Sequence, residues 1–186
     1  MKRGVTMPKI LENVAEDILR VSRDLILKEG YSNVSIRKIA SACGVSTGTI
    51  YNYYKSKDEI LVCVIKDEWN TVIRKVDVTI KNNTNYIYSL KEIYLEVQYF
   101  MNIVHFISFN NLTTSLSPDK FLELKQSKRQ YRNQLSEKIC QCLKDLNIPK
   151  ENDLVYNLIV DMFFTYSRDE SITFDDLIPY IKKLLN

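Results

Sequence analysis

Two short helical patterns that meet at one glycine constrain the fold of this chain most strongly. Ser35 is placed to cap the first helix. The apolar residues of this helix repeat at i, i+3, i+4 and i+7 and so share one face: Ile36, Ile39, Ala40 and Cys43. Gly44 follows that face, where a left-handed backbone is easiest without a Cβ atom. Because Ser46 can then cap a second helix, the spacing predicts a helix-turn-helix over about residues 34–54.

The second helix of this motif has an apolar face and a polar face. Ile50 and Tyr54 lie four residues apart and are expected to face inward. The remaining face carries hydroxyl groups, an amide and a glycine: Thr47, Gly48, Thr49, Tyr51, Asn52 and Tyr53. Hydroxyl and amide groups can reach base edges and phosphates, and a glycine lets the start of the helix approach a duplex closely. The pattern therefore indicates a helix that lies in the major groove of DNA.

A longer pattern surrounds this motif. It consists of Ile18-Leu19, Gly30-Tyr31, Ile39-Ala40, Gly44-Val45-Ser46, Gly48, Tyr51, Tyr53-Tyr54, Lys57 and Leu61. With these residues, the segment from Ile18 to about Ile65 resembles the TetR-type family of transcriptional regulators. The resemblance implies a three-helix DNA-binding head followed by a helical body that senses a ligand and dimerises. Thr47 and Asn52 lie at variable reading positions of the family, so the operator sequence does not carry over.

Several side chains of the head are candidates for contacts with DNA. The resemblance implies that Lys57 contacts a phosphate, against the alternative of an ordinary solvated lysine, and that the Tyr51 hydroxyl does the same. Ser35 and Arg37 open the first helix of the motif, where N–H groups and a guanidinium could bind phosphates. The expected DNA-binding residues are Ser35, Arg37, Ser46, Thr47, Gly48, Thr49, Tyr51, Asn52, Tyr53 and Lys57.

The charge of the chain is distributed unevenly. Its net charge is +3, but residues 1–57 hold ten Lys/Arg against five Asp/Glu, whereas residues 58–186 hold sixteen against eighteen. Basic charge on the part that carries the motif is what phosphate neutralisation requires. We therefore expect a DNA-binding domain at 1–57 and an effector-binding and dimerisation domain at 58–186.

The pattern beyond the motif is entirely helical. Glycine does not occur after Gly48, so the rest of the chain lacks the glycine-containing turns that usually separate strands. The fold is therefore expected to be all-α. A first helix is expected over about 9–29, with Val14, Ile18, Val21 or Ser22, and Leu25 inward. Ser56 and Glu59 form a capping box that opens a helix of about 24 residues.

The expected helices of the body follow this long one. After a break at Asn82, Asn83 and Asn85, the periodicity from Leu90 to Phe106 predicts one that is buried nearly all round, because apolar residues occupy two of its faces. The others are expected at about 117–145 and 152–167, and from Thr173, or alternatively Pro179, to Leu185.

Aromatic side chains in the body could line an apolar pocket between helices, although each one could equally be ordinary core. The candidate pocket residues are Trp69, Tyr94, Tyr99, Phe100, His105, Phe106, Phe109, Tyr131 and Phe163. His105 is the only histidine of the chain and could offer a switchable hydrogen bond to an effector, or could be a satisfied core residue.

The last two helices could supply half of a four-helix dimer interface, which is how the resembled family pairs. The candidate interface residues are Leu154, Leu158, Met162, Leu177, Ile181 and Leu184. Packing within one chain is the alternative for these residues.

The composition argues against other classes of protein. With one histidine, no phosphate-binding loop and no paired catalytic carboxylates in a motif, an enzyme is not expected. Four scattered cysteines lack the spacing of a zinc site and are expected to be reduced thiols, so no metal or cofactor is expected. No signal peptide or membrane span is recognisable, which favours a cytoplasmic location.

Together these features predict a bacterial, homodimeric transcriptional regulator. We expect it to be a repressor that binds a palindromic operator and is released by a small apolar or amphipathic ligand. The alternative is an architectural or adaptor protein that binds DNA through the same head, needs no effector and acts through a protein partner.

Overall fold

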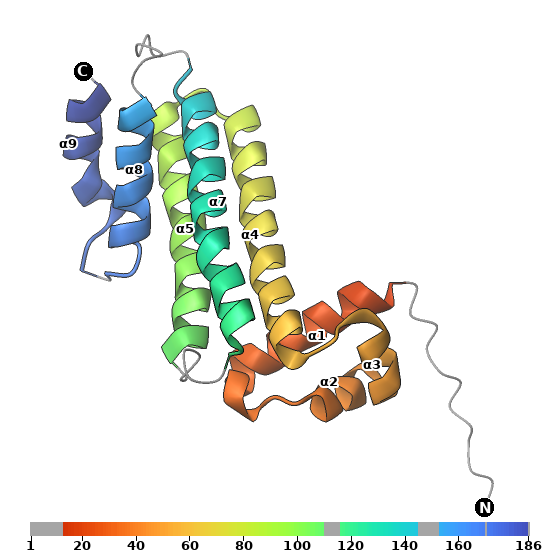
Figure 1. Cartoon of the computed structure of the whole chain (residues 1–186). Coiled ribbons are helices and arrows are strands. Elements are labelled where there is room, and N and C mark those ends of the chain that lie inside the picture. Colours follow the sequence, from red (N-terminus) through yellow and green to blue (C-terminus); the bar gives the residue numbers. More distant parts are fainter. Residues whose placement is uncertain (1–12, 110–115, 145–152, 170, 186) are drawn as a thin grey trace, which may run out of the picture. The chain divides into compact units, whose positions relative to one another are not determined.

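The computed structural model describes residues 13–109, 116–144, 153–169 and 171–185. Within these residues the fold is all-α, as predicted, and no strand occurs (Figure 1). The helices are α1 (Val14–Glu29), α2 (Ile36–Cys43), α3 (Thr47–Tyr53), α4 (Lys57–Asn82), α5 (Tyr86–Phe109), α7 (Pro118–Cys142), α8 (Asp153–Tyr166) and α9 (Phe174–Leu185). A short 3-10 turn, Tyr31–Asn33, joins α1 to α2. None of the described helices is long and apolar enough to cross a lipid bilayer.

The chain divides into two compact units. Unit 1 comprises Met1–Ile65 and Phe106–Phe121, and unit 2 comprises Lys66–His105 and Leu122–Asn186. The long helices α4, α5 and α7 each contribute residues to both units. This division concerns compactness alone, so the expected functional boundary between residues 57 and 58 stays a prediction.

Unit 1 is built on α1, which buries residues spaced four apart. Ile18, Ser22 and Ile26 are buried, so of the expected pair Val21 and Ser22 it is Ser22 that faces inward. Leu25 was expected inward, but it is only half-buried, because it lies at the edge of the face that Ile18 and Ile26 define. The expected start of this helix near residue 9 lies outside the described residues.

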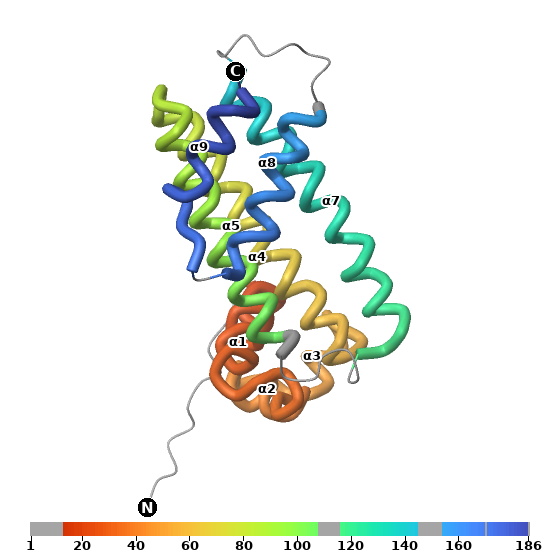
Figure 2. The backbone as a smooth tube through the Cα atoms, turned by 90° about the vertical axis from the view of Figure 1, so that its left-hand side faces the viewer, coloured from red at the N-terminus to blue at the C-terminus, as the bar shows by residue number. Residues whose placement is uncertain are grey.

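In unit 2, parts of α4, α5 and α7 run alongside one another, with α8 and α9 packed against them (Figures 1 and 2). Trp69, Val72 and Val76 of α4 are buried, and they recur at helical spacing on one face. The inward face of α5 is buried as well and consists of Leu90, Ile93, Tyr94, Val97 and Phe100. The core of this unit therefore lies between α4, α5, α7 and α8.

The prediction that α5 is buried nearly all round is wrong. Leu95 and Tyr99 are each 43% exposed and Phe106 is 42% exposed, although Ile103 is buried. His105, for which a satisfied core position was one of the two alternatives, is exposed. The physical reason is that burial of one apolar face is enough to hold the helix in the fold. Sequence periodicity does not show whether a second apolar face is covered by another helix.

The helix ends follow the local signals. Ser56 caps α4, accepting a hydrogen bond from the Glu59 N–H at 3.0 Å, and α4 extends over 26 residues, or about 39 Å at 1.5 Å per residue. The last helix begins at Phe174, because the Asp176 carboxylate accepts bonds from both the N–H (2.8 Å) and the hydroxyl (2.7 Å) of Thr173. Of the two predicted starts the one at Thr173 is therefore right, and Pro179 lies inside the helix.

Candidate nucleic-acid interface

The turn between α2 and α3 has the predicted caps. The Ser35 hydroxyl accepts a bond from the Lys38 N–H at 3.3 Å, and the Ser46 hydroxyl accepts one from the Thr49 N–H at 3.0 Å. Gly44 is left-handed, with φ of 70°, and the Val45 N–H donates to the Ala40 carbonyl at 2.9 Å. These two features form a Schellman motif, which ends α2 and redirects the chain into α3. The helix-turn-helix predicted over residues 34–54 is therefore present.

The two inward residues of α3 set its orientation. Ile50 is fully buried and Tyr54 nearly so, and the Tyr54 hydroxyl donates to the Ala15 carbonyl of α1 at 3.1 Å. The opposite face carries the predicted polar surface, in which Thr47, Gly48, Tyr51, Asn52 and Tyr53 are exposed and Thr49 is half-buried. Tyr51 is 55% exposed, so most of its ring is available to a partner. Unit 1 thus presents one hydroxyl-rich helical face to solvent.

The cations near this face differ in what they contact. Arg37 and Lys55 are exposed, and neither makes an ion pair or hydrogen bond through its side chain to another described residue. Lys38 instead pairs with Glu29 at 2.7 Å. Ser35, the remaining candidate on α2, is exposed and engaged in its cap.

Lys57, expected to contact a phosphate, turns toward the interior of unit 1. Its ammonium donates to the Tyr31 carbonyl at 3.1 Å and lies 4.1 Å from the centre of the Tyr31 ring. The side chain is half-buried, and burial lowers the pKa of the Lys57 ammonium, an effect that the nearby Asp58 opposes. Which group Lys57 contacts was not visible in the sequence, because Tyr31 lies 26 residues away.

Asp58 forms a second, unpredicted connection in unit 1. One carboxylate oxygen accepts a hydrogen bond from the Tyr31 hydroxyl, and the other accepts one from the Ser117 N–H at 2.9 Å. Burial alone would raise the Asp58 pKa, but these hydrogen bonds and the charge of Lys57 together lower it. The same surroundings raise the pKa of Tyr31, first through burial and then through its bond to Asp58. Asp58 thus joins the 3-10 turn, the first turn of α4 and the start of α7.

The aromatic pocket candidates lie in two packed clusters and on the surface. Trp69 stacks on Tyr131 and Phe164, with ring centroids 4.8 and 5.9 Å away, and meets the edge of Phe100. Tyr94 packs edge-on against Phe163, whereas Tyr99, His105 and Phe106 are exposed. The Phe109 side chain lies outside what the structure describes. The clustered rings pack against one another. That these residues line an effector pocket therefore stays a prediction.

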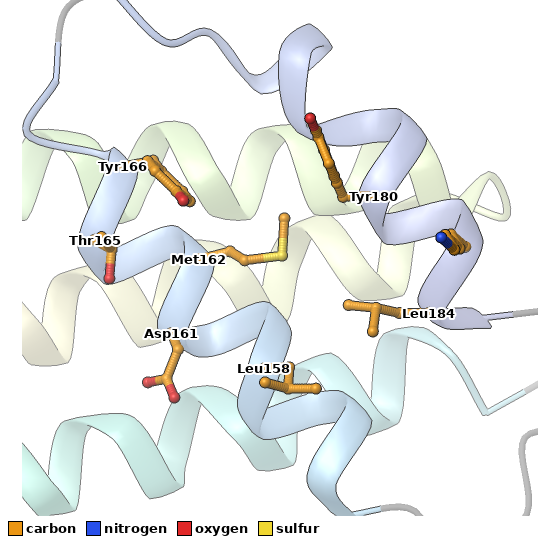
Figure 3. A pocket seen from close by; sticks show the side chains of 8 residues that line it. Leu158, Asp161, Met162, Thr165, Tyr166, Tyr180 and Leu184 are labelled. Atoms are coloured by element: carbon orange, nitrogen blue, oxygen red, sulfur yellow. The ribbon is translucent and has the colours of Figure 1, made fainter.

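The candidate residues of the dimer interface divide into two that are buried within the chain and others that lie on the surface of α8 and α9. Leu177 and Ile181 are buried within the chain, so they cannot line an interface unless α9 moves. Leu158, Met162 and Leu184 instead line a groove on the α8–α9 surface (Figure 3). The groove also contains residues that the sequence analysis missed: Asp161, Thr165, Tyr166, Tyr180 and Lys183. Leu154, at the start of α8, is 66% exposed.

The four cysteines all lie in the described part of the chain. Cys43, Cys63, Cys140 and Cys142 are all free thiols, as the sequence indicated. Burial raises the pKa of Cys142 to about 11, which keeps that thiol protonated near neutral pH. No group of three His, Cys, Asp or Glu side chains that could hold a metal ion occurs among the described residues.

Comparison with known proteins agrees with this architecture. Residues 18–64 match the family model described as bacterial regulatory proteins, tetR family. The regulator HbdR of Aromatoleum sp. strain CIB is 33% identical over 85 residues, which are 46% of this chain and 37% of HbdR. The fatty acid metabolism regulator protein of Bacillus subtilis is 34% identical over 64 residues, which are 34% of this chain and 33% of that protein. These matches span about a third of the length of each curated relative.

A solved structure extends the likeness over the rest of the fold. The transcriptional regulator FadR of Bacillus subtilis, crystallised with stearoyl-CoA, superposes with a TM-score of 0.60 at 20% identity, covering 91% of this chain and 96% of that one. At this identity the superposition shows a shared fold. The family match and the shared all-α fold lead to one conclusion: residues 18–64 form a head of the type found in the tetR family of bacterial regulatory proteins, and the chain shares its fold with a transcriptional regulator.

Proposed function

We propose that this regulator binds a specific DNA sequence by placing α3 in the major groove. The observation that carries the proposal is the orientation of α3, whose apolar residues Ile50 and Tyr54 are buried while its hydroxyl and amide groups face solvent. Base edges in the major groove offer donors and acceptors that such groups can match. In this arrangement Thr47, Tyr51 and Asn52 read bases or phosphates, and the exposed Arg37 neutralises a phosphate.

The same proposal assigns positioning contacts to the other polar residues of the motif. Ser35 and Ser46 hold the first turns of α2 and α3 in place through their caps, so that N–H groups remain available to phosphates. Tyr53, which is exposed next to the end of α3, contributes its hydroxyl, and Thr49 supports Ser46 at 2.9 Å between their hydroxyl oxygens. Contacts of this kind set the register of the helix on the duplex rather than the sequence.

Gly48→Leu is expected to weaken operator binding strongly while the head stays folded. A Cβ atom at Gly48 would meet only the Ser46 hydroxyl, at 3.5 Å, and leucine favours a helix more than glycine does by about 0.8–1 kcal/mol. The added side chain would stand between α3 and the groove. We expect a loss of affinity of about 100-fold or more, equivalent to about 2.8 kcal/mol, in a gel-shift titration. Gly48→Ala is the matched control, with a smaller loss, and full operator affinity of Gly48→Leu would refute close approach at this position.

A homodimer with the α8–α9 groove at its interface completes this proposal. Leucine, methionine and tyrosine side chains line the groove, and such residues are typical of the core of a protein interface. A second copy related by a two-fold axis would place α8 and α9 against their equivalents. Two heads arranged in this way would read half-sites of a palindrome about 34–36 Å apart, or a multiple of that spacing.

The effector is the third part of the proposal: a small apolar or amphipathic ligand binds the body and releases the DNA, so that the protein acts as a repressor. Support comes from FadR of Bacillus subtilis, which has the same fold and was crystallised with stearoyl-CoA, an amphipathic ligand. In this chain α4 belongs to both units, so a ligand that favours one packing of α4 in unit 2 biases the head through the same helix.

Effector binding is expected to change the fluorescence of Trp69, the sole tryptophan. Trp69 is 1% exposed, and its indole N–H donates to Gln134 at 2.6 Å within the cluster formed with Phe100, Tyr131 and Phe164. A ligand that inserts among these rings must alter their stacking. Stearoyl-CoA is the first probe to titrate, with CoA alone as the control. A ligand that releases DNA without a change in Trp69 emission would show that this cluster is not part of the effector site.

An effector-independent adaptor is the second candidate, because α5 exposes apolar side chains while the aromatic clusters of the body are packed. Tyr88, Leu95 and Tyr99 recur on one face of α5, at 50%, 43% and 43% exposure. A protein partner could cover such a face. The adaptor reading predicts that Leu95→Ser leaves DNA binding unchanged but removes regulation in cells, whereas the repressor reading predicts normal release by the effector in this variant.

A further inference from the structure

A polar groove between α7 and α8 has no role in the proposed function. Its volume of about 540 Å³ lies within the range of about 300–1,000 Å³ that is typical of small-molecule sites. Its polar lining includes Asn133, Ser136, Glu137 and Gln141 of α7, and Asn157 of α8. None of its lining residues belongs to the α8–α9 groove, so pairing through that groove does not require this one to be covered.

Contacts between α7 and α8 hold the two walls of this groove in place. The Arg132 guanidinium forms an ion pair with the Asp161 carboxylate. Tyr156, which lines the groove, is only 7% exposed and so belongs to the packed core of unit 2. A ligand therefore meets walls that are already ordered, which lowers the entropy cost of binding.

Cations extend the α7 wall beyond one end of the groove. Lys125, Lys128 and Arg129 are exposed, and none forms an ion pair or a side-chain hydrogen bond within the part of the chain that the structure describes. Residues four apart on a helix are neighbours, so Arg129 lies beside Asn133, and Lys125 lies one turn further from the groove. Residues 120–132 hold five Lys/Arg against one Asp/Glu, although residues 58–186 hold sixteen against eighteen. This end of the groove therefore attracts an anion.

The rest of the groove offers a carboxylate and amides. Glu137 follows Arg129 by eight residues, about 12 Å along the helix axis at 1.5 Å per residue. Carboxylates accept hydrogen bonds from ribose hydroxyls in dinucleotide-binding folds, and amide side chains match the edges of bases. Gln141 and Asn157 are exposed amides of this kind. Because Glu137 would repel a ligand that was anionic throughout, the groove fits a ligand with phosphates at one end and neutral hydrogen-bonding groups at the other.

We propose that the α7–α8 groove binds a nucleoside phosphate. The phosphates lie against Arg129 and Lys125, and the guanidinium of arginine forms bidentate hydrogen bonds to phosphate. The ribose and base lie toward Glu137 and the amides of Gln141 and Asn157. This site is separate from the aromatic clusters to which the proposed function assigns the effector, so it is a second small-molecule site on the body.

Cys140 makes this site observable, because it lines the groove and is the one exposed cysteine among the four of the chain. The probes are ADP, GDP, CDP and UDP, and calorimetry on the full chain measures the Kd of each. At about ten times its Kd a ligand leaves about one site in eleven free, so we expect alkylation of Cys140 by iodoacetamide to slow about tenfold. Mass spectrometry of the labelled peptides measures this rate, and Cys43 in unit 1 is the internal reference.

Arg129→Gln tests the phosphate contact. Arg129 is exposed and forms no ion pair with another described residue, so we expect an unchanged melting temperature. The Kd of the nucleoside diphosphate is expected to rise about tenfold, because hydrogen bonds to charged groups are among the stronger ones. Lys81→Gln removes an exposed cation of α4 and is the matched control, with a change in Kd of less than about twofold. The corresponding nucleoside, which lacks phosphates, is expected to bind Arg129→Gln and the unaltered protein equally weakly.

The outcomes separate this site from the proposed function. Failure of all four nucleotides to protect Cys140 would overturn the site, and equal protection by pyrophosphate would overturn the assignment of a nucleoside. An equal loss of affinity in Lys81→Gln would also overturn it, because overall charge would then account for binding. A gel-shift titration is the separate test of the proposed function: Arg129→Gln is expected to bind DNA as before, and absence of binding to any duplex by the unaltered protein would refute that function instead.

Discussion

Leu158→Glu is expected to leave the chain folded but monomeric, and to lower operator affinity by about 100-fold or more. Leu158 is 38% exposed on α8 and lines the α8–α9 groove, so the unpaired chain tolerates a charged side chain there. In a two-fold interface each substitution occurs twice, and each carboxylate would be buried without a partner. Loss of the second head removes the gain in affinity from two linked sites, which is typically about 10²–10⁴. Light scattering after size exclusion and a gel-shift titration measure the two effects.

The matched control for this experiment is Leu95→Glu. Leu95 is 43% exposed, and the change is the same, but the residue lies on α5 rather than on the groove. We expect this variant to remain dimeric and to bind the operator as before. A monomeric Leu95→Glu together with a dimeric Leu158→Glu would move the interface to α5 and contradict the assignment of the groove. Far-UV circular dichroism checks that both variants keep their helices.

Asp58→Ala is expected to destabilise unit 1 by about 3 kcal/mol, because it removes the acceptor for two hydrogen bonds. The Tyr31 hydroxyl and the Ser117 N–H both donate to this carboxylate, and hydrogen bonds to charged groups contribute about 1.5–3 kcal/mol each. Two such bonds would together contribute about 3–6 kcal/mol, and we expect a value near the lower end because Asp58 is only half-buried. Chemical denaturation followed by circular dichroism measures the loss. Asp67→Ala, an exposed carboxylate on the same helix, is the control and is expected to change stability by less than about 0.5 kcal/mol.

The difference between the unaltered protein and Asp58→Ala is expected to depend on pH. Burial alone would raise the Asp58 pKa, but the bonds from Tyr31 and Ser117 lower it below its value in the unfolded chain, about 3.9. A carboxyl group with a lowered pKa stabilises the fold above the unfolded value, and this contribution is lost as the pH falls through the folded value. The stability difference should therefore be full near pH 7 and shrink below about pH 4. A difference that stays constant down to pH 3 would show that the charge of Asp58 does not matter.

Much of the DNA-binding head could be predicted because its signals are local. The caps at Ser35 and Ser46 and the left-handed Gly44 each act within about four residues, so the chain around them contains the whole interaction. The same holds for the inward position of Ile50 and Tyr54, which follows from helical spacing alone. For these residues the amino-acid sequence was sufficient to predict the local structure and the side chains that face inward.

The functional surfaces of the body could be predicted only in part. Helical spacing identified apolar stripes on α5, α8 and α9, but not which of them another helix covers. Tyr180 was missed and is 64% exposed beside the groove, whereas Ile181, a predicted interface residue, is fully buried. Adjacent residues on a helix point about 100° apart, so a small error in the orientation of α9 exchanges core and surface.

The amino-acid sequence by itself determined the all-α class, the helix-turn-helix and the outward polar face of α3, since each depends on short-range hydrogen bonds and periodicity. Only the tertiary structure decided the surroundings of Lys57 and Asp58. Their partner Tyr31 lies 26 and 27 residues away, and Ser117 lies 59 residues from Asp58. Contacts over such separations exist only after folding has brought distant segments together, and no local pattern in the chain encodes them.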